Sequence, residues 1–181
     1  MIIGFCGRKR SGKDTAAAVA VQEGFMQLSF ASPMKQMLRQ LLHAQGARPH
    51  EIQAMLEGDL KEVPTPYFND QSPRHAMQTL GTEWGRKALG DDFWVNTLMR
   101  TSSMYSRVVI SDVRFPNEAD AIRTKGGLVF RITRPGLANN DNHPSEALID
   151  KITVDGEIEN SASLEEFQYI IRNTLLRAIA A

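Results

Sequence analysis

The sequence has one cysteine, no excess of charge of either sign and no long apolar segment. Cys6 cannot form a disulfide within the chain, which fits a reducing compartment. Lys and Arg together number 21, as do Asp and Glu, whereas proteins that coat nucleic acid usually carry a basic excess. No apolar stretch approaches the roughly 18 residues of a membrane span, and the N-terminus lacks the features of a secretion signal. We therefore expect a soluble, cytoplasmic protein that neither coats nucleic acid nor enters a membrane.

The length of 181 residues allows one full hydrophobic core, and strand-like segments alternate with helix-like ones. Short apolar segments predict five strands, at 2–6, 25–30, 107–112, 128–133 and 152–154. Apolar spacings of three and four predict buried helix faces at Met34, Met37, Leu38, Leu41 and Leu42, at Met77, Leu80 and Trp84, and at Leu164, Phe167, Ile171 and Leu175. Ser163 and Glu166 form a capping-box pattern at the start of the last helix. This alternation favours an α/β fold with a mainly parallel sheet.

The segment from Gly7 to Lys13 fits the pattern G-x-x-x-x-G-K and lies between a predicted strand and a predicted helix. Its glycines let the backbone curl so that N–H groups point at phosphate oxygens, and the helix N-terminus adds partial positive charge. Lys13 can reach the β- and γ-phosphates. A plain strand–turn–helix would need both glycines and the lysine to fall in register by chance. The predicted ATP-binding residues are Gly7, Arg10, Ser11, Gly12, Lys13, Asp14 and Thr15.

Asp14 departs from this pattern, which has Ser or Thr after the lysine to hold Mg²⁺. At about 4 Å, a carboxylate repels a phosphate oxygen by about 1 kcal/mol in water and about 4 kcal/mol at an effective dielectric of 20. Asp14 must therefore face away or act through Mg²⁺ and its waters, and Thr15 becomes the better hydroxyl. Alternatively, Asp14 is a first-turn acid that the helix dipole stabilises. Both interpretations stay open.

Further candidates for catalysis lie in the loop and after the strand at 107–112. We expect at least one of Arg8, Lys9 and Arg10 to hold the transferred phosphoryl group, because phosphoryl transfer needs positive charge on its oxygens. Asp112 ends an apolar strand, as in the Walker B pattern, where the carboxylate orients Mg²⁺ or its water. Arg114 could reach an acceptor phosphate. The alternative for Arg114 is an ion pair with Glu118 or Asp120.

Several cationic side chains in the middle of the chain could bind a phosphorylated acceptor. Lys35 and Arg39 share one helix face, where an anionic ligand would offset their repulsion, although a solvated face explains them equally well. Arg74, Gln78 and Gly81 line one stripe of a later helix and could bind a phosphate and a base edge. Arg86 follows on an adjacent face. A surface helix with scattered arginines is the alternative.

A polar loop at 135–144 follows the fourth predicted strand and suits a lid that excludes water. Arg131 and Arg134 flank it and are candidate lid residues. His143 lies within it, and we assign this histidine no catalytic role.

Taken together, GRKRSGKDT, FASPMK, RHAMQTLGTEWGRKALGDDFW and SDVRFPNEA resemble the bacteriophage deoxynucleoside monophosphate kinases. The resemblance covers about residues 2–135, and G-x-x-x-x-G-K-D-T and LGTEWGR are its most specific parts. It implies a P-loop three-layer α/β/α fold with a five-stranded, mainly parallel sheet. It also implies one kinase domain, with a core at 1–30 and 105–181, a helical acceptor-binding insertion at about 31–104 and a lid at about 131–145.

The resemblance further implies the reaction ATP + dNMP = ADP + dNDP by in-line transfer, in host cytoplasm if a phage encodes the protein. It suggests ATP contacts for Arg10, Gly12, Lys13, Asp14 and Thr15, and acceptor contacts for Lys9, Arg74 and Arg114. Lys13, Arg10, Arg114 and Asp112 are the catalytic candidates, and Lys35, Gln78 and Arg86 complete the acceptor set. The cofactor would be Mg²⁺, held by Thr15, Asp14 and Asp112 directly or through water. The expected partners are ATP and dNMP, with no direct nucleic acid, and a homodimer is open by resemblance alone.

Three alternatives remain. Animal-type phosphomevalonate kinase shares the SGKD loop and an SD-x-R strand end, and dephospho-CoA kinase is a more distant rival. A P-loop ATPase switch or assembly factor would hydrolyse ATP without a small acceptor. The bases accepted and the preference for deoxyribose over ribose stay open at this point.

Overall fold

The computed structural model describes residues 1–137 and 148–180. The chain forms two compact units, Met1–Phe30 with Leu98–Ala181, and Ala31–Thr97. Each unit is described by itself below. Within the described residues, no helix is long and apolar enough to cross a membrane.

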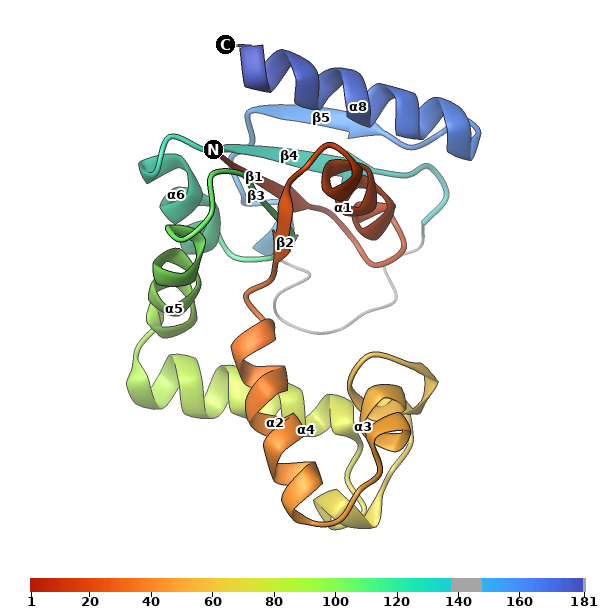
Figure 1. The fold of residues 1–181 in the computed structure, drawn as a ribbon, viewed down its shortest axis with the longest axis vertical. Helices are drawn as coiled ribbons and strands as arrows, with labels where there is room; N and C mark the ends of the chain where they lie inside the picture. Colours follow the sequence, from red (N-terminus) through yellow and green to blue (C-terminus); the bar gives the residue numbers. More distant parts are fainter. Residues whose placement is uncertain (138–147, 181) are drawn as a thin grey trace. The chain divides into compact units, whose positions relative to one another are not determined.

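The first unit is built on a parallel sheet of five strands (Figure 1). The strands are β1 (Ile2–Cys6), β2 (Met26–Leu28), β3 (Val108–Val113), β4 (Leu128–Thr133) and β5 (Gly156–Glu159). Their order is β2-β3-β1-β4-β5, and every neighbouring pair is parallel. The predicted α/β fold with a five-stranded parallel sheet is therefore confirmed.

The position predicted for the last strand, 152–154, was wrong. Ile152 is buried but precedes the strand, which begins at Gly156. Asp155 holds the start of the pairing, because its N–H donates to the Val129 carbonyl at 2.8 Å and its carboxylate accepts from the Val129 N–H at 2.7 Å. Residues 152–154 carry the β-branched side chains that are typical of a strand. Ile152 is nevertheless buried by packing and not by strand pairing.

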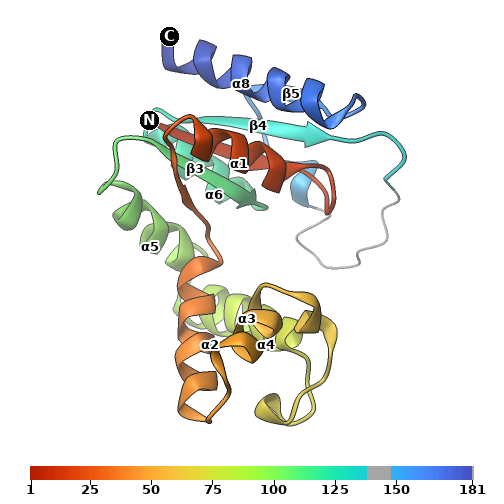
Figure 2. The same ribbon diagram turned by 45° about the vertical axis from the view of Figure 1, so that its right-hand side comes forward.

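Helices cover both faces of the sheet (Figures 1 and 2). Helices α1 (Lys13–Gln22) and α8 (Leu164–Ala180) pack against each other on one face, and α6 (Pro116–Thr124) packs on the opposite face. The core under α1 and α8 is made of Ile3, Phe5, Val19, Val109, Ile132, Ile158, Phe167, Ile171 and Leu175, among others. Gly4 faces α6, where a Cβ would lie 2.7 Å from Cδ1 of Ile122, so this strand residue has no room for a side chain.

The last helix begins as the sequence predicts. The Ser163 N–H donates to the Glu166 carboxylate at 3.0 Å, and the Glu166 N–H donates to the Ser163 hydroxyl at 3.3 Å, which forms the capping box. Phe167, Ile171 and Leu175 are buried as predicted. The prediction for Leu164 was wrong: it is 62% exposed and lines a cavity at the start of the helix.

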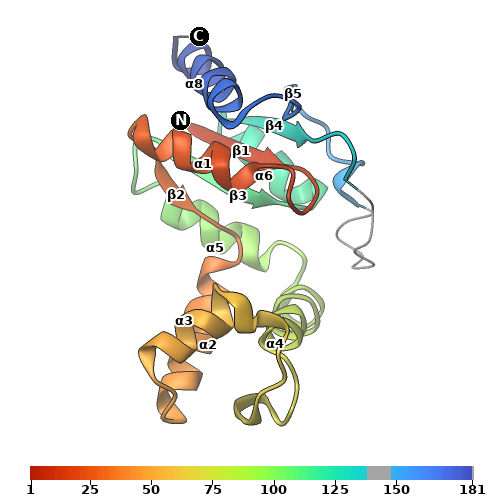
Figure 3. The same cartoon turned by 90° about the vertical axis from the view of Figure 1, so that its right-hand side faces the viewer.

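The second unit is helical (Figure 3). Its elements are α2 (Ser32–Ala44), α3 (Pro49–Leu56), η1 (Asp59–Glu62), η2 (Pro66–Phe68), α4 (Pro73–Thr79), the π-helix η3 (Leu80–Ala88) and the start of α5 (Phe93–Ser102). Its core contains Leu38, Leu42, Ile52, Met55, Leu56 and Met77. Met37, Leu41 and Trp84 were predicted to be buried but are 42%, 48% and 39% exposed. The buried stripe of α2 is therefore narrower than its apolar spacing suggested, and the π-helical turn rotates Trp84 away from the stripe of Met77.

Candidate active site

The loop between β1 and α1 curls as the glycine pattern predicts. Gly7 and Gly12 have φ angles of 140° and 113°, which L side chains rarely adopt, and Arg10 has a φ of 66°. At Gly7, a Cβ would lie 2.3 Å from the carbonyl oxygen of Ile132 on β4. Both glycines are therefore required by backbone conformation, and Gly7 is also required by the close approach of the neighbouring strand.

Lys13 is the first residue of α1, and its ammonium group folds back over the loop. Its Nζ donates to the carbonyl oxygens of Gly7 and Arg8, both at 2.7 Å. These bonds hold the cation beside the concave side of the loop, next to the N–H groups at the helix start. The loop thus presents backbone donors and a lysine at one place, which is the arrangement that holds nucleotide phosphates.

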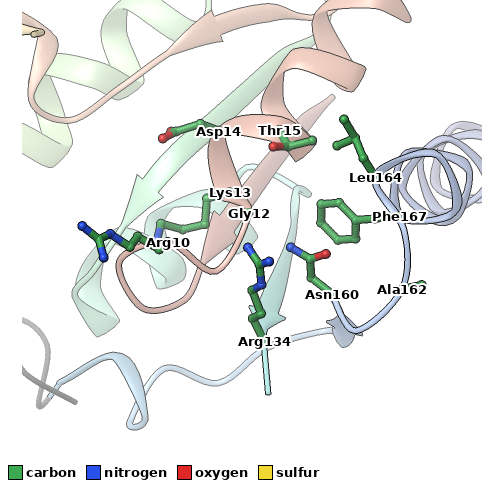
Figure 4. Close-up of a pocket in the computed structure, with 10 residues that line it drawn as sticks. All are labelled: Arg10, Gly12, Lys13, Asp14, Thr15, Arg134, Asn160, Ala162, Leu164 and Phe167. Carbon is green, nitrogen blue, oxygen red and sulfur yellow. The ribbon is translucent and has the colours of Figure 1, made fainter. Parts of the chain in front are cut away.

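A cavity of about 390 Å³ lies beside the loop (Figure 4). Its walls come from the loop and the start of α1, from the end of β4 and from the connection between β5 and α8. The lining residues are Arg10, Gly12, Lys13, Asp14, Thr15, Arg134, Asn160, Ala162, Leu164 and Phe167. Five of them belong to the predicted ATP site. The exposed Asp14 and the half-buried Thr15 share the first turn of α1, and both interpretations of Asp14 stand.

Sequence reasoning missed the wall that comes from residues 160–167. Asn160 follows β5 directly, and its Nδ2 donates to the carbonyl oxygen of Ser11 at 2.9 Å, across 149 residues of sequence. Figure 4 shows its amide beside Arg134, with the Phe167 ring on its other side. The capping box at Ser163 marks the helix start, but no local pattern connects this segment to the phosphate loop.

Asp112 lies at the carboxyl end of β3, the strand next to β1, on the edge where the loop begins. Its Oδ1 accepts a hydrogen bond from the Phe30 N–H at 2.9 Å, which fixes the carboxylate. Two residues later, the N–H groups of Arg114 and Phe115 donate to the carboxylate of Glu118, at 2.7 and 3.1 Å. Glu118 is thus fixed by backbone donors at the start of α6.

The two arginines predicted for the lid have different surroundings. The guanidinium of Arg131 donates to the Glu157 carboxylate at 2.6 Å and to the carbonyl oxygens of Ile152 and Ile149, at 2.7 and 3.3 Å. It therefore ties β4 to β5 and to the segment before β5. Arg134 lines the cavity of Figure 4 and a second one of about 250 Å³. The remainder of the predicted lid, 138–145 with His143, lies outside the described residues.

One cation of the loop, Arg8, lines the second cavity and has a protein partner. Arg8 forms an ion pair with Asp150 at 3.0 Å. Lys9 and Arg10 are exposed.

Burial raises the pKa of the Cys6 thiol, which ends β1, and the nearby Arg131 only partly opposes this. A thiol in this state is a poor nucleophile, so Cys6 has no place in the chemistry.

In the second unit, most predicted acceptor residues have partners within the protein. Lys35 pairs with Glu57 at 2.7 Å, and Arg74 pairs with Glu62 at 3.0 Å. Glu57 offsets the repulsion between Lys35 and Arg39, for which an anionic ligand was invoked.

The remaining two predicted acceptor residues lie along α4 and η3. Gln78 is half-buried on α4, and Arg86 donates to the Asp91 carbonyl oxygen at 3.1 Å. The π-helix is held from one side by Trp94, whose Nε1 donates to the Gly81 carbonyl oxygen at 2.9 Å. Helices of this kind occur often at functional sites.

A parallel five-stranded sheet, a glycine loop with its lysine and a strand-end aspartate on the neighbouring strand together define a P-loop protein that binds a nucleoside triphosphate. The sequence model of the deoxynucleotide monophosphate kinases matches residues 51–171. A protein of Acanthamoeba polyphaga mimivirus, named provisionally as a deoxynucleotide monophosphate kinase, is 34% identical over 183 residues, covering 92% of both chains. The chain belongs to the deoxynucleotide monophosphate kinase family.

A phage protein that matches part of the chain and a solved structure also resemble it. The deoxynucleotide monophosphate kinase of Enterobacteria phage T4 is 36% identical over 109 residues, which cover 58% of this chain and 45% of that protein. Among solved structures, dephospho-CoA kinase from Campylobacter jejuni resembles the chain with a TM-score of 0.49 at 15% identity, over 98% of this chain and 96% of that one. The resemblance stated from the sequence motifs is thus confirmed at the level of the family.

Proposed function

We propose that the protein transfers the γ-phosphoryl group of ATP to a deoxyribonucleoside 5′-monophosphate, giving ADP and the diphosphate. The observation that carries this proposal is the cavity beside the phosphate loop, in a chain of this family. Phosphoryl transfer needs alignment and positive charge more than covalent help. The first unit offers both, through the curled backbone of the loop and the cations Lys13, Arg10 and Arg134.

The donor nucleotide would lie with its phosphates in the loop and its base toward the β5–α8 connection. The loop end of the cavity carries backbone N–H groups and Lys13, which suit an anion. The wall from the β5–α8 connection carries Ala162 and Leu164, whose apolar atoms suit a flat base. We assign ATP contacts to Gly7, Arg10, Ser11, Gly12, Lys13, Asp14 and Thr15.

Thr15, Asp14 and Asp112 would hold Mg²⁺, directly or through water. All three offer oxygen ligands, which Mg²⁺ prefers, and Asp112 is already oriented by the Phe30 N–H. When bound, the ion supplies positive charge to the phosphate oxygens.

We propose acceptor contacts for Lys9, Arg74 and Arg114, as the family resemblance implies, and for Lys35, Gln78 and Arg86, as their charge and helical spacing suggest. The second unit then serves as the acceptor-binding insertion of a single kinase domain. The carboxylates of Glu57 and Glu62 compete for Lys35 and Arg74, so acceptor binding must exchange these ion pairs for phosphate contacts. Both cations are half-buried at the surface, and surface ion pairs contribute only about 0–1 kcal/mol, so exchanging them costs little. Arg131 and Arg134 would be the arginines of a lid, and the protein would act on free nucleotides in the cytoplasm.

A coupled assay of ADP release tests this function. ATP and Mg²⁺ are supplied with a panel of dNMPs, NMPs, phosphomevalonate and dephospho-CoA, and ADP release is recorded with and without each acceptor. Acceleration by at least one dNMP is expected. ATP hydrolysis that no acceptor accelerates would instead favour a nucleotide-dependent switch, and acceleration by phosphomevalonate or dephospho-CoA alone would name a different kinase.

Lys13→Ala should lower kcat/KM by about a hundredfold or more, because it removes the cation that reaches the β- and γ-phosphates. Lys125→Ala is the matched control: this lysine is exposed at the end of α6, away from the loop, and its loss should leave turnover unchanged. Arg114→Ala should also lose most of kcat/KM while the fold survives. Near-normal turnover in Arg114→Ala would remove this arginine from the site.

A further inference from the structure

Asn160 connects the end of the sheet to the phosphate loop. Its backbone N–H donates to the Thr133 carbonyl oxygen at 2.7 Å, which continues the pairing of β5 with β4. Its side-chain Nδ2 donates to the Ser11 carbonyl oxygen at 2.9 Å. The side chain therefore reaches the loop from a backbone position that the sheet already holds rigid.

The contact between this amide and the loop is close. Ser11 is 1% exposed. At Gly12, a Cβ would lie 2.6 Å from Nδ2 of Asn160 and 3.1 Å from Cε1 of Phe167. The loop turns at Gly12 with a φ of 113°, so the glycine permits both this turn and the approach of the amide.

A hydrogen bond to the Ser11 carbonyl also determines where the next N–H group points. The peptide between Ser11 and Gly12 is trans and planar, so its C=O and N–H point in opposite directions. Because the Ser11 C=O points toward Asn160, the Gly12 N–H points away from Asn160. This N–H belongs to the backbone donors at the start of α1, which bind phosphate oxygens in loops of this kind.

We propose that Asn160 is a positioning residue for the donor nucleotide: it sets the orientation of the Ser11–Gly12 peptide and so pre-arranges the phosphate-binding N–H of Gly12. The role rests on the proposed function, because it assumes that the loop binds the phosphates of ATP. This role predicts weaker binding of ATP and unchanged binding of the dNMP, because Asn160 also lines the proposed ATP cavity.

The test uses the full-length protein with Asn160→Leu and Asn160→Asp. Leu keeps the approximate size of the side chain and removes the N–H group that donates the hydrogen bond. Asp keeps the shape of the side chain and replaces that N–H group by an oxygen that can only accept a hydrogen bond. Each should raise the KM for ATP by about five- to tenfold, the effect of one lost hydrogen bond, with the KM for the dNMP unchanged. Asn173→Leu, on α8 away from the cavity, is the matched control and should leave both constants unchanged.

Calorimetric titration of ATP without any acceptor gives a second readout. Wild-type protein should bind ATP about five- to tenfold more tightly than either Asn160 variant. An unchanged KM and affinity for ATP in Asn160→Leu would overturn the proposal, as would wild-type behaviour of Asn160→Asp or an equal rise in both KM values. Absence of transfer to every dNMP by the wild type would overturn the proposed function alone, since ATP titration still decides the role of Asn160.

Discussion

Gly85 in the π-helix η3 is a position where a side chain has almost no room. A Cβ built there would lie 2.1 Å from Nε1 of Trp94 and 2.5 Å from Cε2 of the same ring. Trp94 is 4% exposed, and its Nε1 donates to the Gly81 carbonyl oxygen at 2.9 Å. Because non-bonded atoms settle at about 3.5–4.0 Å, Gly85→Ala must displace the buried indole by about 1 Å or more.

The expected cost is about 3 kcal/mol of the free energy of unfolding. Overpacking a core costs about 1–3 kcal/mol, and a buried N–H that loses its partner costs about 1–3 kcal/mol. The higher helix propensity of Ala offsets only about 0.5–1 kcal/mol of this destabilisation. The net effect is a clear destabilisation of the second unit.

Gly81→Ala is the matched control in the same helix. Its added Cβ would meet only the Met34 thioether, with Sδ at 3.2 Å and Cε at 3.6 Å, and this flexible side chain can move. The gain in helix preference then roughly balances the contact, so the stability of Gly81→Ala should stay within about 1 kcal/mol of wild type.

Urea unfolding followed by tryptophan fluorescence measures both variants. Gly85→Ala should unfold at a lower midpoint, and its native emission should shift to the red as the Trp94 indole leaves its buried position. Equal stability of the two variants would refute the reasoning, because it would mean that the indole does not lie against Gly85.

Two further predictions concern titratable groups. Hydrogen bonds from the Ser163 hydroxyl and N–H lower the pKa of Glu166, so its contribution to stability is present above the ordinary pKa of a glutamate, about 4.3, and is lost as the pH falls through the lowered value. Glu166→Gln should therefore be less stable than wild type in urea unfolding at pH 7 and equal to it in strong acid; a difference that does not depend on pH would contradict this. Burial raises the pKa of the Cys6 thiol, so a thiol reagent should label the native protein far more slowly than the urea-unfolded chain, and equal rates would show that Cys6 is accessible.

The donor side of the candidate site could be predicted from the sequence, because its residues are close together in the chain. Gly7 to Thr15 form one turn between a strand and a helix, and local spacing alone describes such a unit. Asp112 could be placed as well, since the carboxyl ends of parallel strands share one edge of a sheet. Asn160 could not, because its contact with Ser11 spans 149 residues and depends on the register of β5 beside β4.

The acceptor side shows a different limit of sequence reasoning. Lys35 and Arg74 were chosen for their charge and helical spacing, but neither property shows that Glu57 and Glu62 lie beside them. Charged side chains on helices reach partners from other segments, and these partners follow from packing rather than from spacing. The assignment of these cations to acceptor phosphate stays a prediction.

The sequence by itself determined the phosphate loop, the order of strands and helices and the family, because each depends on local patterns of glycine, charge and apolar spacing. The tertiary structure alone decided which side chains complete the site. It brought Asn160 and Phe167 against the loop, and it paired Arg131 on β4 with Glu157 on β5. The physical reason is that a hydrogen bond or a close contact depends on distance in space, and the sheet sets those distances only when the whole chain has folded.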